Sequence, residues 1–258
     1  MKHPITMVAT VFMIMLGLLL RGAAAEDISC VETTTNCRTG SWSHDYDYSA
    51  CACYNTERTC ADDGHDCMLS CSGAYACAFM TIHGPPDPHK LHVICTGGGS
   101  YPEGSYTCRD IQVHGEASAG VRFTCGTTDN RCGIDADIFC PGCAQSGIPG
   151  ACAAYPAGSS GSGECSVRCA ASVKPPWRSQ FGTCYDMDVY SGARGTAVTC
   201  VEEGTSTSKI TCQNLQLHAL PDAGDNAVAA ADAPLSLSCE SCEGSSSSRC
   251  CKNAEITP

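Results

Sequence analysis

A stretch with the pattern Cys-x-x-Φ-x-Φ-His, where Φ is an apolar residue, recurs along the chain and limits the folds open to it. Clear copies end at His83, His114 and His218, and a weaker copy ends at Tyr190. After each copy a second alternating run ends on a cysteine, at Cys95, Cys125, Cys200 and Cys239. Alternation with period two is typical of half-buried β-strands. The repeat therefore predicts an all-β chain built from strand, turn, strand and cysteine-rich turn.

The spacing of the copies indicates how the strands assemble. Their first cysteines are 31 residues apart between Cys77 and Cys108, and 28 residues apart between Cys184 and Cys212. Repeats of this length are typical of stacked-repeat folds with one coil per repeat. We therefore expect a disulfide-stapled β-solenoid, with two irregular disulfide-rich β-domains as the alternative. The expected strands lie near 79–83, 91–95, 109–114, 121–125, 186–190, 196–200, 210–217 and 235–239.

One short turn carries a resemblance to a known class of fold. The turn Cys71-Ser-Gly73-Ala-Tyr-Ala-Cys77 has the pattern Cys-x-Gly-x-x-[Ser/Ala]-Cys. Such turns resemble those in the coils of small cysteine-rich secreted proteins of the right-handed parallel β-helix class. The likeness covers residues 67 to 251 and concerns the fold. It implies parallel strands in stacked coils.

The cysteine content predicts extensive cross-linking. All 24 cysteines follow residue 25, and such density in an exported chain argues for disulfides rather than metal clusters. In each repeat a strand-ending cysteine precedes a short turn and then a strand-starting cysteine. This order predicts bonds that close one corner of each coil: Cys71 with Cys77, Cys95 with Cys108, Cys125 with Cys132, and Cys200 with Cys212. Bonds between stacked coils, such as Cys95 with Cys125, are the competing pattern.

The first 25 residues have the features of a secretory signal peptide. An apolar run from Ile5 to Leu20 precedes a small-residue cleavage site at Ala23-Ala24-Ala25. Removing this segment takes away Lys2 and Arg21 and no acid, so the net charge goes from −12 to −14. An acidic surface disfavours nucleic acid, and no later segment is apolar enough to span a membrane. We expect a secreted, extracellular chain with no cofactor, whose partner is a glycan or a protein.

Composition divides the rest of the chain. Residues 26–66 lack the repeat and hold closely spaced cysteines, so they are expected to form a Cys-rich N-terminal cap. A first solenoid half is expected over 67–157, a Gly/Ser linker over 158–164, and a second half with the tail over 165–258. Residues 221–234 are rich in Ala, Asp and Gly and predict a long loop between two paired strands.

The four residues that end the repeats, His83, His114, His218 and Tyr190, are the candidate binding residues. If the coils stack, His83 and His114 lie one strand spacing apart, roughly 5 Å. This spacing suits an exposed binding strip or two ligands of one metal. The alternative is that histidine marks the entry to a turn. Because the sequence supplies no third metal ligand and His218 belongs to the other half, we expect no metal site.

Two other motifs have metal-like spacing. The pairs Cys140-x-x-Cys143 and Cys239-x-x-Cys242 suggest zinc binding or thiol exchange, but they lie in turns of a cysteine-dense exported chain, which favours structural disulfides. The acids in 62–66 and 135–137 offer oxygen ligands for calcium. Neither group has EF-hand spacing, so solvated acidic loops are the expected structure.

Many parallel β-helices cleave acidic polysaccharides with clustered acids, so the acids of this chain are possible catalytic residues. The chain has isolated aspartates on or near its predicted strands, namely Asp110, Asp135, Asp137, Asp186 and Asp188. The His-Gly pairs resemble a fragment of a polygalacturonase motif, but the preceding glycine and an Asp-Asp pair are absent. The sequence therefore favours a non-catalytic scaffold that presents a surface for glycan or protein binding. The alternatives are a polysaccharide-active β-helix enzyme, and a secreted effector or inhibitor acting through a loop such as 85–89 or 221–234.

Overall fold

The structure is a computed structural model, and every regular element in the part of the chain that it describes is a β-strand. It describes residues 26–31, 51–96, 106–127, 132–141, 163–171, 182–192, 195–202, 210–219, 234–241 and 250–257. The signal-peptide prediction for residues 1–25 and most of the loop predicted over 221–234 lie outside these ranges. Within them, no helix is long and apolar enough to cross a membrane.

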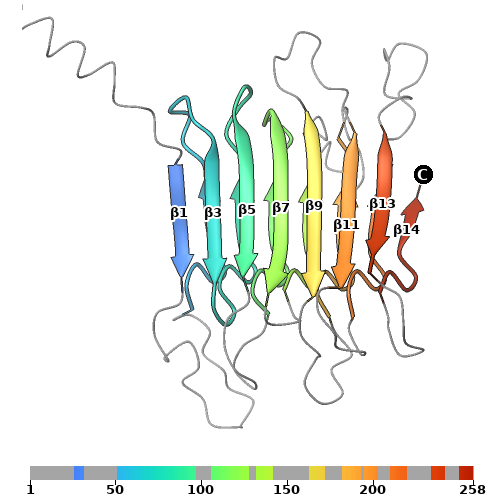
Figure 1. The fold of residues 1–258 in the computed structure, drawn as a ribbon. Coiled ribbons are helices and arrows are strands. Elements are labelled where there is room, and N and C mark those ends of the chain that lie inside the picture. The colour runs from blue at the N-terminus through green and yellow to red at the C-terminus, as the bar shows by residue number, and fades with distance from the viewer. Residues whose placement is uncertain are drawn as a thin grey trace, which may run out of the picture.

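The strands form two parallel seven-stranded sheets, and the chain alternates between them. Sheet A contains β1 (Glu26–Val31), β3 (Cys67–Ser72), β5 (Lys90–Thr96), β7 (Gly120–Thr127), β9 (Glu164–Ala171), β11 (Thr196–Glu202) and β13 (Leu235–Glu240). Sheet B contains β2 (Glu57–Thr59), β4 (Thr81–His83), β6 (Gln112–His114), β8 (Asp137–Phe139), β10 (Asp188–Tyr190), β12 (Gln216–His218) and β14 (Glu255–Thr257). The strands of sheet A lie side by side in chain order (Figure 1). The all-β, disulfide-rich class predicted from the sequence is confirmed.

Alternation along each strand separates a buried column from exposed ones. In sheet A the buried column includes Leu69, Val93, Phe123, Val167 and Val198, and these residues are paired in register across neighbouring strands. In sheet B the corresponding column is Ile82, Val113, Ile138, Val189 and Leu217. The two columns belong to one core cluster. The outward residues of neighbouring strands are aligned in columns in the same way, and these columns form the outer faces of the two sheets.

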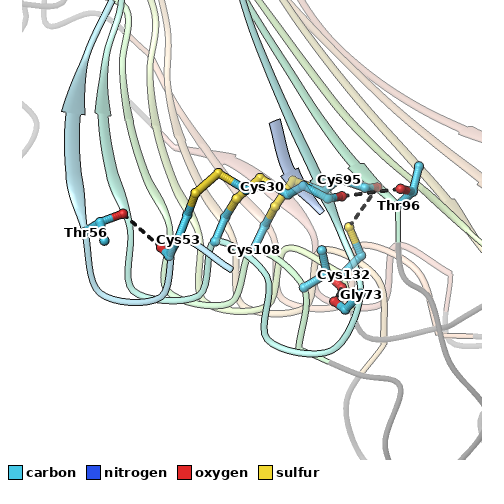
Figure 2. Close-up of a disulfide and its surroundings, with 11 residues drawn as sticks. Cys30, Cys53, Thr56, Gly73, Cys95, Thr96, Cys108 and Cys132 are labelled. Atoms are coloured by element: carbon cyan, nitrogen blue, oxygen red, sulfur yellow. Dashed lines mark hydrogen bonds between the residues drawn. A yellow bond between two sulfur atoms is a disulfide. The ribbon is translucent and has the colours of Figure 1, made fainter. Parts of the chain in front are cut away.

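A column of cysteines ends the strands of sheet A, and each member bonds to a cysteine in the turn that follows. The bonds are Cys30–Cys53, Cys71–Cys77, Cys95–Cys108, Cys125–Cys132, Cys169–Cys184, Cys200–Cys212 and Cys239–Cys251. Figure 2 shows Cys30 with Cys53 and, in the next coils, Cys95 and Cys108. Each closes the connection that leads from a strand of sheet A to the next strand of sheet B, and we call these seven the corner bonds. The four predicted corner pairs are among them. The competing bond between Cys95 and Cys125 is not formed.

Two further disulfides lie at the opposite corner. Cys60 bonds to Cys67, and Cys140 bonds to Cys165. Each bond joins the end of a sheet B strand to the start of the next sheet A strand. Nine disulfides among the described residues are typical of extracellular proteins.

The turn that enters each sheet B strand explains why these strands are shorter than predicted. Its first and third residues have left-handed backbone, for example Cys108 at φ 54° and Asp110 at φ 51°. Left-handed residues cannot continue a strand, so β6 begins at Gln112 instead of residue 109. The third residue is Asn or Asp in six of the seven turns: Asn55, Asp110, Asp135, Asp186, Asn214 and Asn253. These two residue types tolerate the left-handed region better than other non-glycine residues.

The strand pairing places the predicted cap and the predicted halves within the same sheets. β1 pairs with β3 over six residues and β2 pairs with β4, so the described parts of 26–66 supply the terminal strand at one end of each sheet. β3, which begins at Cys67, pairs with β1 on one side and β5 on the other. β7 pairs directly with β9 across the expected linker. Both sheets therefore run unbroken from the first coil to the last.

Candidate functional site

Five aromatic rings stack along the outer face of sheet B. They are His83, His114, Phe139, Tyr190 and His218, which occupy the same register position on five neighbouring strands. Successive ring centroids are 4.8, 4.7, 4.7 and 4.7 Å apart, and the interplanar angles are 5–19°. This distance equals the spacing of strands in a sheet, so the parallel register itself produces the stack. We call these five residues the ring row.

The stack restricts what the ring row offers to a ligand. Each inner ring has both faces against its neighbours, and Phe139 is buried between His114 and Tyr190. A sugar therefore has no free inner face on which to lie. The ring edges carry the polar atoms: His218 Nε2 lies 2.7 Å from Asp188 Oδ1, and His83 Nε2 lies 3.1 Å from Glu57 Oε1. Recognition at this row would act through hydrogen bonds.

A second outward column runs parallel to the ring row, two residues earlier on each strand. Its members are Glu57, Thr81, Gln112, Asp137, Asp188, Gln216 and Glu255, and all are polar. We call these seven residues the polar row. The two rows alternate with the buried column in the same three-residue strands, so each coil presents one ring-row position and one polar-row position.

Asp137 and Asp188 are directly opposite in the polar row. Burial raises the pKa of Asp137 to about 6, with Asp188 and then Asp110 adding to the rise by charge repulsion, while His114 and His218 oppose it. The pair therefore combines an acid that holds its proton to unusually high pH with a second carboxyl on the next strand. Burial, followed by the charges of Asp188 and Asp137, also raises the pKa of Tyr190.

The left-handed third residues of the turns that enter sheet B form a third column beside the polar row, and most of them are polar. Arg109 bridges two of its acids, with Nε 3.0 Å from Asp110 Oδ2 and an Nη nitrogen 3.6 Å from Asp135 Oδ2. Burial is the main cause that raises the pKa of both aspartates. Further along the column, Asn214 Nδ2 donates to Asp186 Oδ1 at 2.8 Å. The five aspartates that are isolated in sequence thus lie along one side of sheet B.

The elevated pKa of Asp137 predicts how stability depends on pH. The folded state holds this proton up to about pH 6, whereas the ordinary value is 3.8, so ionisation costs stability as the pH rises through this window. We expect Asp137→Asn to stabilise the protein by about 1–2 kcal/mol at pH 7.5, after allowance for solvent screening, and by almost nothing at pH 3.5. Urea unfolding of the oxidised protein at both pH values measures the difference. Asp27→Asn, on exposed β1, is the control, and an equal gain at the two pH values would contradict the assignment.

The structure brings the four candidate binding residues into one row, including His218, which the sequence analysis assigned to a distant half. Phe139 was missed, because its copy of the repeat begins with Cys132-Gly133 and places the left-handed residue one position after the cysteine. The left-handed Asp135 nevertheless lies three residues before the buried Ile138 of the strand, and Asp110 has the same spacing to Val113, so a search on this spacing finds the copy.

Other predicted sites have structural roles. Among the described residues, the groups of three potential metal ligands within 4.8 Å consist only of disulfide-bonded cysteines. Cys140 and Cys239 of the two Cys-x-x-Cys pairs bond to Cys165 and Cys251, while Cys143 and Cys242 lie outside the described ranges. In the loop 85–89, the Pro85 carbonyl accepts a hydrogen bond from Ser118 Oγ at 2.8 Å.

Comparisons of the chain with protein-family profiles, with curated proteins and with solved structures find no match.

Proposed function

We propose that this protein is a secreted β-solenoid of the parallel β-helix type whose sheet B outer face binds an extended glycan without cleaving it. The alternation of the chain between two parallel sheets, with one disulfide-closed corner per coil, supports the solenoid architecture. The observation that carries the binding proposal is the polar row. Its hydrogen-bonding groups repeat at every strand, about 4.8 Å apart, which gives a chain of sugar units a periodic set of partners.

The chemistry of the face favours a neutral or amino-sugar glycan. Five aspartates along one side of sheet B repel a polyanion. Carboxylates and amides are suitable partners for hydroxyl and amino groups. Gln112 and Gln216 make no side-chain hydrogen bond to any described residue, so their amides are open to a ligand. Large exposed apolar side chains, which protein interfaces use as anchors, are limited in the described residues to Phe79 and Ile256, outside the two rows.

Titration calorimetry with three hexasaccharides, of glucose, N-acetylglucosamine and glucosamine, tests the proposal. We expect at least one to bind, and the double substitution Gln112→Ala with Gln216→Ala to weaken it roughly tenfold or more, because two hydrogen bonds are lost. The matched control is Thr124→Ala with Thr199→Ala on the outer side of sheet A. The proposal is rejected if no hexasaccharide binds, or if both double variants weaken binding equally.

A second candidate function is hydrolysis of the bound glycan, and the Asp137–Asp188 pair favours it. Retaining glycosidases use one protonated and one ionised carboxyl about 5 Å apart. Asp137, with its pKa of about 6, is suited to the acid, and Asp188 lies opposite it on the next strand. Release of reducing sugar from a hexasaccharide that binds would support this function. Asp137→Asn should then abolish release and leave binding within a few fold.

A further inference from the structure

A cavity on the outer face of sheet A, away from both rows, has chemistry opposite to that of sheet B. It has a volume of ≈180 Å³ and is lined by Lys90 and His92 from β5, Gly120 and Arg122 from β7, and Glu164 and Ser166 from β9. The hollow follows from the register. Lys90, Gly120 and Glu164 are aligned on three successive strands, and the middle position carries no side chain.

The side of the cavity formed by β5 and β7 is positively charged. Lys90 and Arg122 form no ion pair with any other residue that the structure describes. His92 is aligned with Arg122 on the neighbouring strand, and its Nε2 lies 3.8 Å from Asp66 Oδ2. The pKa of His92 is lowered mainly by burial, and the charges of Arg122 and Lys90 add to this effect against the opposing charge of Asp66.

The opposite side of the cavity is an acceptor. Glu164 also makes no ion pair among the described residues, and it lies two strands away from Lys90, about 10 Å in a parallel sheet. Ser166, on the same strand as Glu164 and aligned with Arg122, adds a hydroxyl to this side. A ligand that satisfies the whole cavity carries an anionic group at one end and hydroxyl donors at the other. The volume is below the range of about 300–1,000 Å³ usual for small-molecule pockets, which suits one small unit.

We propose that this cavity binds a single sulfated sugar unit, with the sulfate against Lys90, His92 and Arg122 and the sugar hydroxyls toward Glu164 and Ser166. The three donors come from two neighbouring strands, Lys90 and His92 from β5 and Arg122 from β7. A tetrahedral oxyanion offers a separate oxygen to each donor, whereas a planar carboxylate offers two oxygens in one plane. The guanidinium of Arg122 matches two of these oxygens at once. This site is independent of the proposed glycan face, because it lies on the other sheet.

NMR titration of the oxidised, isotope-labelled protein with N-acetylglucosamine 6-sulfate tests the proposal. We expect saturable shifts at the Gly120 and Arg122 amides, with no such shifts from unsulfated N-acetylglucosamine and binding at least fivefold weaker for inorganic sulfate. Equal binding of inorganic sulfate would overturn the sugar part of the proposal. Equal binding of glucuronic acid would overturn the preference for a tetrahedral anion, and the absence of shifts with every probe would overturn the site.

Two variants probe the charge and the hollow separately. Arg122→Gln should weaken binding of the sulfated sugar at least tenfold, whereas Arg58→Gln, which removes an exposed arginine from β2, should leave it within twofold. Gly120→Thr keeps the net charge but fills the hollow, since a Cβ there lies 3.2 Å from the Glu164 carbonyl oxygen and 3.5 Å from Lys90 Cδ. It should abolish binding. If Gly120→Thr fails to fold, the comparison of Arg122→Gln with Arg58→Gln still tests the site. Equal loss of binding in these two variants would overturn it. Binding of neutral hexasaccharides to sheet B is expected to be unchanged throughout.

Discussion

Reduction of the disulfides is expected to unfold the protein at room temperature. The seven corner bonds close segments in which the paired cysteines are 6 to 23 residues apart. In the chain-entropy description each such bond stabilises the folded state by about 2–3 kcal/mol. Seven of them exceed the net stability of about 5–15 kcal/mol that is typical of a domain. Removing all of them should therefore leave the unfolded state favoured.

Circular dichroism and a hydrogen-exchange measurement with and without a phosphine reductant check this expectation. The oxidised protein should give a β-rich spectrum and protected amides in both sheets, and the reduced protein should lose both. Treating the oxidised protein with the oxidised form of the reductant is the control. A reduced protein that keeps its protected amides would show that packing between the sheets is sufficient without the bonds.

Removal of one corner bond should have a much smaller effect than full reduction. Replacing Cys200 and Cys212 together with alanine removes a bond across a separation of 12 residues while leaving no free thiol. Because neighbouring coils stay closed and pair with this one on both sides, the fold should persist at lower stability. Non-reducing peptide mapping of this variant should return the other corner pairs unchanged.

The core of the fold was predictable from the sequence because one rule is repeated in it. Alternating apolar residues that end on cysteine identified β5, β7, β11 and β13, whose bounds agree with the predicted strands within three residues. The corner disulfides followed from the order of cysteines around short turns. Both features are local in sequence. Parallel pairing in register then aligns the equivalent residues of successive repeats in columns across the sheet.

The outer coils were missed because their repeats lack the histidine. The first copy, Cys53-Tyr-Asn55, and the last, Cys251-Lys-Asn253, keep the two left-handed positions of the turn but end their strands at Thr59 and Thr257. The left-handed backbone of the turn is therefore present in more copies of the repeat than the histidine that ends the strand. A search for cysteine followed two residues later by Asn or Asp would have found both copies.

Surface sites were the least predictable part. Lys90 and Arg122 are 32 residues apart and have no motif in common, yet the register places them around one glycine. Likewise Asp137 and Asp188 are 51 residues apart but directly opposite. A charge pattern along the chain does not reveal residues that come together across the strands, as Lys90 and Arg122 do.

Gly182→Ala is expected to cause one of the largest losses of stability available to a single substitution. A Cβ at Gly182 would lie 2.1 Å from the Ile210 carbonyl oxygen and 2.4 Å from Ile210 Cβ. Ile210 is buried, and its carbonyl accepts a hydrogen bond from the Thr183 amide at 3.1 Å. The backbone of one coil must therefore move away from the next, which strains the packing and weakens this bond. We expect a loss of about 2–4 kcal/mol.

Gly126→Ala is the matched control for this prediction. Gly126 lies in β7, and the nearest atom to a Cβ there is Ala170 Cβ at 4.0 Å, an ordinary contact. With room for the methyl group, the substitution mainly restricts the unfolded chain and should change the free energy of unfolding by less than about 1 kcal/mol. Urea unfolding of both variants with their disulfides intact gives the comparison. Similar losses at the two positions would mean that the close approach of the coils at Gly182 does not limit stability, and that the contact relaxes without cost.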